Sequence, residues 1–406
     1  MTKAHHWRPA ALLLVAALSL GGCAGPVSTD ALEDVPSTGT STPTPPTPTS
    51  PTPSATATPS PEPTVPAVTY DRIPSRVPLT CDELVPPAAA GAAINIPAEQ
   101  VTPFVYPLAD GFAAELQGGV LMCDWTDAGT TEFIDSPENL LDVAVLPDAK
   151  RNFRDFVDAF ASDRDNSGLL GKSSYLECSV YEDLRSCSGA FVVDGYWVEF
   201  DSTGPAPTEE DKPEYAAALA LGTVIQGTLG TAGPPLAAFE VPKGSAPLWD
   251  SCSALDANKK FRKKLKSTGL TAPEQDNNEG PFVLFTVAWN RADFGSCVWR
   301  HDDTYSTPTG QVRQTSVWIL PGGGWAWEEL RDGDLARPGA ELVTIDGADE
   351  AVVYCNDDVT GCSIIALVDG SFVSFDVDYD DPDGGLGAEA AVRAGANFLF
   401  PRIVAG

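Results

Sequence analysis

Histidine is scarce in this chain of 406 residues, which contains three: His5, His6 and His301. The first two fall within an N-terminal segment that we expect to be removed, so His301 alone is left in the expected mature chain. Serine–histidine pairs, cysteine–histidine pairs and most zinc sites depend on histidine. The scarcity argues against all three chemistries, and we predict that the protein is not an enzyme.

The chain also contains few positively charged residues. The chain has 25 lysine and arginine residues against 57 aspartate and glutamate residues, which leaves a formal net charge of -32. Nucleic acid and anionic wall polymer repel so acidic a chain, and we expect no nucleic-acid partner. The basic cluster at residues 259–266 is interpreted as a solvated helix face, with docking to a phosphate-bearing wall polymer or to an acidic patch of the same protein as the alternative.

The apolar run near the start of the chain is too short to span a membrane. Residues 10–20 follow the basic Lys3 and Arg8 and lead, through small residues, to Cys23. This order fits a signal peptide rather than a transmembrane helix. The end of the run resembles the lipobox of bacterial lipoproteins. The resemblance implies a signal peptide over residues 1–22, a palmitate-type anchor on Cys23 and a location on the extracytoplasmic face of the cell membrane; an ordinary secretory signal is the alternative.

Residues 23–68 contain little that can be buried, because proline alternates there with threonine and serine. Such a composition predicts a disordered stalk. In extended polyproline II form the stalk would reach roughly 140 Å from its anchor. A linker with no particular length requirement is an equal alternative.

The chain has no Cys-x-x-Cys pair, which argues against a redox or zinc site. Of its nine cysteines, one is assigned to the anchor and eight remain for disulfides. Several pairings are possible in principle, and we favour the one that places closely spaced cysteines opposite each other in a hairpin. The favoured pairs are Cys81 with Cys123, Cys178 with Cys187, Cys252 with Cys297 and Cys355 with Cys362.

Two segments of the chain, residues 178–201 and 355–376, repeat one pattern at a spacing of about 175 residues. Each contains a close cysteine pair and, seven positions after the second cysteine, an Asp-Gly dipeptide of the kind that forms tight hairpin turns. The repeat predicts a tandem duplication with module 1 at 69–229, a hinge at 230–246 and module 2 at 247–406.

Each module is predicted to belong to the α+β class, with a mostly antiparallel sheet and helices in the order α-βββ-α-βββ-α. A helix begins near Thr80 and near Ser251, and each module ends on a helix. The expected segments between them are hairpins at 111–127 and 281–302, third strands at 143–147 and 317–321, and closing helices at 213–229 and 386–400.

Three features recur in both copies: a helix that bears Cys-x-x-Leu (Cys81, Cys252), a Cys-x-Trp strand (Trp125, Trp299) and the close cysteine pair. Together they resemble secreted lipoprotein domains of unknown function from actinobacteria, the high-GC Gram-positive bacteria. The resemblance implies a cell-surface role and supplies no catalytic residues.

Candidate ligand-binding residues are few. Trp325 follows three glycines and aligns with Arg151 of the first copy, so we expect it to be exposed and able to stack on a sugar or peptide ring. His301 is placed at a strand end, either as a solvated turn residue or as a binding residue. Asp376, Asp378 and Asp380 alternate near the end of the last strand, where carboxylates could hold Ca²⁺; a solvated acidic loop is the alternative.

The function that we expect is that of a membrane-anchored extracytoplasmic binding or sensor lipoprotein. Its partner would be a small molecule, a glycan or an envelope protein, bound between the modules or on the face that bears Trp325. An accessory subunit of an envelope or secretion complex is the first alternative. A carboxylate-based cell-wall hydrolase is the second.

Overall fold

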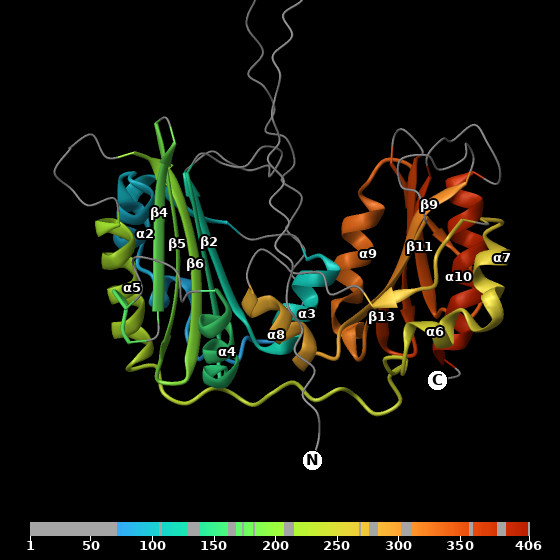
Figure 1. Cartoon of the computed structure of the whole chain (residues 1–406), viewed down its shortest axis with the longest axis horizontal. Helices are drawn as coiled ribbons and strands as arrows, with labels where there is room; N and C mark the ends of the chain where they lie inside the picture. Colours follow the sequence, from blue (N-terminus) through green and yellow to red (C-terminus); the bar gives the residue numbers. More distant parts are fainter. Residues whose placement is uncertain are drawn as a thin grey trace, which may run out of the picture. The chain divides into compact units, whose positions relative to one another are not determined.

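The computed structural model describes residues 71–404. Within that range it leaves out residues 105–107, 128–138, 161–167, 173, 182, 207–214, 268, 276–282, 302–310, 357–359 and 380–386. Two antiparallel sheets and their helices make up the described chain, which confirms the α+β class (Figure 1). Each sheet lies within one of the two predicted module ranges. None of the described helices is long and apolar enough to cross a membrane.

The first sheet has six strands in the order β1-β2-β3-β6-β5-β4. The strands are β1 (Val101–Phe104), β2 (Leu121–Asp127), β3 (Leu140–Leu146), β4 (Ser174–Tyr181), β5 (Leu184–Val193) and β6 (Tyr196–Pro205). The helices of this half are α1 (Cys81–Leu84), α2 (Pro87–Ile94), η1 (Ala98–Gln100), α3 (Asp110–Gly118), α4 (Lys150–Phe160) and α5 (Ala216–Leu229).

The second sheet has seven strands in the order β10-β11-β12-β13-β9-β8-β7. The strands are β7 (Glu274–Gln275), β8 (Gly295–Arg300), β9 (Val312–Leu320), β10 (Glu341–Val343), β11 (Glu350–Cys355), β12 (Gly361–Val368) and β13 (Ser371–Tyr379). Its helices are α6 (Cys252–Leu255), η2 (Ala257–Lys259), α7 (Lys260–Lys264), α8 (Val283–Arg291), η3 (Gly323–Ala326), α9 (Trp327–Leu335) and α10 (Ala388–Val404).

The predicted Asp-Gly turns join β5 to β6 and β12 to β13. Asp194 has a φ of 45° and Gly195 one of 92°, while Asp369 and Gly370 have 43° and 68°. Positive φ at both central residues is the signature of the type I′ hairpin turn, which matches the twist of the flanking strands.

All four predicted disulfides are present. In each half one bridge ties the first helix to the Cys-x-Trp strand, and the other joins register partners of a hairpin. Trp125 and Trp299 are fully buried in the same clusters as these bridges. Disulfides persist in oxidising compartments, so the folded part of the chain belongs outside the cytoplasm.

One part of the predicted element order is wrong. The segments 111–127 and 281–302 were expected to be hairpins, but each forms a helix, α3 or α8, followed by one strand, β2 or β8. The helices are short and carry apolar or small residues on most sides. They therefore lack the alternation of apolar and polar faces by which a helix is recognised in a sequence.

Each sheet is covered on both faces. On the first sheet α2 and α5 pack on one face, and on the second sheet α10 packs on one face (Figure 1). The other faces are covered jointly by α4 with α8 and by α9 with α3. Helix α8 comes from the second half of the chain and α3 from the first, so the two halves exchange a helix.

The exchanged helices contact each other and make matching bonds to the opposite half. Gln117 on α3 donates through its side-chain amide to the carbonyl of Pro321, at 2.8 Å. Arg291 on α8 donates to the carbonyl of Pro147, at 2.7 Å. Gln117 and Arg291 stand at equivalent positions of the two copies, as do the two prolines, so the interface repeats the duplication.

Candidate functional site

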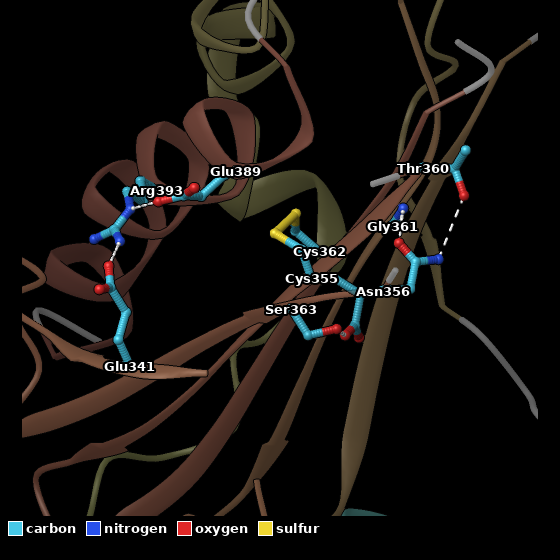
Figure 2. The surroundings of a disulfide bond; sticks show 10 residues. Glu341, Cys355, Asn356, Thr360, Gly361, Cys362, Ser363, Glu389 and Arg393 are labelled. Atoms are coloured by element: carbon cyan, nitrogen blue, oxygen red, sulfur yellow. Dashed lines mark hydrogen bonds and ion pairs between the residues drawn. A yellow bond between two sulfur atoms is a disulfide. The ribbon is translucent and has the colours of Figure 1, made fainter. Parts of the chain in front are cut away.

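A cavity of about 860 Å³ lies beside the disulfide Cys355–Cys362 of the second half (Figure 2). Its walls are the end of β11, the segment that leads into β10, and the first turn and a half of α10. Small-molecule sites commonly have volumes between about 300 and 1,000 Å³. The cavity is therefore large enough for a small organic ligand, and it lies within one half of the chain rather than between the two.

Charged side chains on one wall of the cavity are paired with one another. Arg393 of α10 donates to Glu389 on the same helix at 2.8 Å and to Glu341 at the start of β10 (Figure 2). Two carboxylates against one guanidinium leave the group with one negative charge. It therefore favours a neutral or cationic ligand over an anion.

Asn356 and the disulfide form the opposite wall. The side-chain oxygen of Asn356 accepts from the backbone N–H of Gly361 at 2.7 Å, and its amide donates to Thr360 at 3.3 Å (Figure 2). The disulfide is one residue away, and together with these bonds it restrains this wall. A preformed wall lowers the ordering cost of binding.

The sheet edge inside the cavity is open in the described structure. Strand β10 has three residues, and its pairing with β11 stops at Val353. Tyr354 and Cys355 continue β11 past that point and line the cavity. An unpaired strand edge offers backbone N–H and C=O groups to an extended ligand.

A second unusual group lies on the first sheet, and we call it the acid row: Asp124, Asp142 and Asp201. These residues are register partners on β2, β3 and β6. They share the sheet face that α4 and α8 cover, and one oxygen of Asp142 is buried without a hydrogen-bond partner among the described residues. Asp124 also lines a cavity of about 400 Å³ with Phe112 and Met122.

Burial is the main reason why the pKa values in the acid row are raised. Burial raises the pKa of Asp124 to about 9, with further increases from its hydrogen bond to Asp142 and from the charges of Asp142 and Glu115. Burial raises the pKa of Asp142 to about 6, although the bond from Asp124 lowers it. Burial also raises the pKa of Glu115 and of Glu199, each to about 8. At neutral pH Asp124 therefore holds a proton, while Asp142 is largely ionised and accepts the hydrogen bond from Asp124.

The Asp124–Asp142 pair does not have the geometry of a glycoside hydrolase. Those enzymes separate their two carboxyl groups by about 5 Å or more. A direct hydrogen bond brings the two carboxyls of this pair closer than that. Proton sharing between neighbouring acids is what this arrangement can do chemically.

The second sheet does not repeat the acid row: it keeps one aspartate, and that residue lies among serine hydroxyls. Asp376 is the counterpart of Asp201, and it accepts from Ser363 at 2.5 Å, from Ser316 at 3.4 Å and from Ser374 at 3.5 Å. Val298 stands at the position of Asp124. The duplicated modules have thus diverged at this site, and only the first carries the acid row.

The calcium prediction concerned Asp376, Asp378 and Asp380. Asp376 is held by the serines, and Asp378 is paired with Arg313. Asp380 lies outside the described residues. Across the described ranges, no group of three or more histidine, cysteine, aspartate or glutamate residues is placed to hold a metal ion, and calcium binding stays a prediction.

The predicted ligand-binding residues do not meet at one site. Trp325 is half-buried against the cluster that contains α3, and its indole N–H donates to Gln117 at 3.1 Å. Arg151 is exposed on α4, and His301 forms an isolated bridge with Leu270. Ligand binding at these three residues stays a prediction. Cys23 lies outside the described residues.

Sequence reasoning missed Asp124 and Asp142 for a local reason. Asp124 stands between Cys123 and Trp125, so strand alternation turns it away from the face that holds the disulfide. A carboxylate on the opposite face is expected to meet solvent. It is buried because other parts of the chain cover that face, among them Phe112 and Leu116 of α3, which line the same cavity as Asp124.

Comparisons with known proteins add little. No family model matches the chain, and no curated protein matches it. Among solved structures, the crystal structure of the di-domain ARO/CYC StfQ from the steffimycin biosynthetic pathway shares 10% identity with the chain, over 81% of this chain and 97% of that one. Its TM-score is 0.15, so this similarity carries no argument about fold or function. The resemblance to actinobacterial lipoprotein domains stays a prediction.

Proposed function

We propose that this protein is a membrane-anchored extracytoplasmic lipoprotein that binds a small polar ligand in the cavity beside Cys355–Cys362. The observation that carries the proposal is the cavity itself, whose volume of about 860 Å³ suits a small organic molecule. Its charged side chains and open strand edge provide hydrogen-bonding groups that can orient a ligand. The four disulfides fit a protein that works outside the cytoplasm.

The electrostatics of the cavity narrow the class of ligand. Glu341, Glu389 and Arg393 together carry one negative charge, and the chain as a whole carries -32. A neutral sugar or an extended peptide without net negative charge meets both conditions. A peptide could also pair with the free edge of β11 beyond Val353.

Filling the cavity tests the proposal. Ala390 lines it from an exposed position on α10, so Ala390→Trp occupies the ligand space without entering the core. Ala220→Trp places the same ring at an exposed position of α5, the corresponding helix of the first half. Full-length proteins purified from native membranes are compared by native mass spectrometry. We expect a bound molecule on the wild type and on Ala220→Trp, and none on Ala390→Trp.

An equal amount of bound molecule on both variants would contradict the assignment to this cavity. Absence of any bound molecule from wild-type protein, even after incubation with soluble cell-wall fragments, would contradict the binding function itself. The two outcomes separate the location of the site from its existence.

A further inference from the structure

A cationic cavity of about 720 Å³ lies at the start of the second half, away from the cavity beside the disulfide. Lys259, Arg262, Lys263 and Lys266 line it. Arg262 and Lys263 lie on α7, while Lys259 directly precedes that helix and Lys266 follows its end. Like charges gathered around one cavity repel each other unless something anionic lies among them.

The described carboxylates do little to neutralise this face. Arg262 is held by Asp256, which also accepts from the backbone N–H of Phe261. In the described chain no carboxylate pairs with Lys259, Lys263 or Lys266. In a chain with 57 acidic and 25 basic residues, three lysines in one cavity without such a partner are unexpected.

The backbone around the cavity is held in an unusual conformation. Asn258, Lys259 and Lys266 have φ values of 61°, 58° and 54°, and none of them is glycine. Left-handed backbone at such residues is uncommon and persists where the surroundings enforce it. Here Phe261 and Leu265 anchor α7 in the core, so the lysines are presented from a fixed base.

The floor of the cavity is polar and ordered. Arg262 donates to the carbonyl of Leu270 at 2.9 Å, and Ser267 is buried with its hydroxyl bonded to the carbonyl of Val312 at 3.3 Å. These bonds join the floor to β9 and to the segment ahead of β7. The cavity is thus part of the folded domain and not a gap between loose side chains.

We propose that this cavity binds the phosphate group of a small phosphorylated molecule. Lysine ammonium groups and a guanidinium are the side chains that bind phosphate, and several of them are needed for a dianion. The volume suits a small molecule. A small molecule fits better than a long polyanion, because the remaining surface of a chain with net charge -32 repels a polyanion.

Two double variants of the full chain, each lacking two positive charges, test the inference. Lys259→Gln with Lys263→Gln removes two charges that line the cavity. Lys260→Gln with Lys264→Gln removes two charges from the same helix that do not line it. Binding of inorganic pyrophosphate is measured by calorimetry at about 50 mM salt, where screening is weak. We expect saturable binding to the wild type, a loss of about 10-fold or more in the first variant and a change below about 2-fold in the second.

Equal losses in the two variants would overturn the proposal, because they would reflect net charge and not a site. No saturable binding of pyrophosphate would overturn it too, unless vesicles of phosphatidylglycerol bind with the same difference between variants while vesicles of phosphatidylcholine do not. That pattern would assign the phosphate to a lipid headgroup.

Discussion

Asp124 and Asp142 are two buried acids that share a hydrogen bond on neighbouring strands. Because burial raises the pKa of both, the folded state holds protons that the unfolded chain releases at lower pH. Stability linked to such groups is complete at acidic pH and is lost as the pH rises towards the folded-state pKa. The acid row therefore makes the free energy of unfolding decrease as the pH rises.

Replacing Asp124 tests this linkage. We expect the free energy of unfolding of the wild type to fall between about pH 5 and pH 9. Asp124→Asn keeps a hydrogen-bond donor for Asp142 but cannot ionise. Its stability relative to the wild type should improve by on the order of 2 kcal/mol across that range. Urea denaturation at the two pH values measures the difference.

Asp155→Asn is the matched control, since Asp155 is exposed on α4. It should leave the pH dependence as it is in the wild type. The interpretation would be wrong if Asp124→Asn showed the wild-type pH dependence as well.

Helices α3 and α8 are the elements on which the arrangement of the two halves depends. They cross where Gly118 meets the backbone of Ala288, and a Cβ atom at position 118 would lie 2.3 Å from the Ala288 carbonyl oxygen. Glycine is required there by the close approach of two backbones.

Gly118→Ala should therefore force the helices apart and lower the free energy of unfolding by about 1 to 3 kcal/mol. Gly227→Ala on α5 is the control, because nothing lies within 4 Å of its added Cβ. That variant should gain up to about 1 kcal/mol from helix propensity. Thermal denaturation of both proteins separates the two effects, and similar shifts in the same direction would show that helix crossing is not the cause.

At the scale of the whole molecule, the sequence predicts those parts of the structure that a local pattern determines. The two Asp-Gly turns and the pairing of Cys178 with Cys187 follow from spacing within single hairpins. Helices α3 and α8 did not follow, because each is completed by contacts with the other half of the chain. The burial of Asp124 depends on the same distant contacts.

The proposed membrane anchor belongs to the scale of the whole chain, and a substitution at Cys23 tests it. Cys23→Ala should abolish palmitate labelling and move the protein from the membrane fraction to the medium, since the variant lacks the thiol to which the proposed acyl anchor is attached. Labelled fatty acid and cell fractionation measure both changes. Persistent labelling of the variant would refute attachment at this residue.

The connector between the halves is irregular in structure and is bonded at both ends. Leu236 exchanges two hydrogen bonds with Arg76, and the backbone of Ala246 donates to Asp369. Because α3 and α8 are each seated in the opposite half, a protease that cuts between Leu236 and Ala246 would produce two fragments that remain associated. The folded protein is thus expected not to need an intact connector. Cleavage of the connector in the cell would leave the two halves bound to each other.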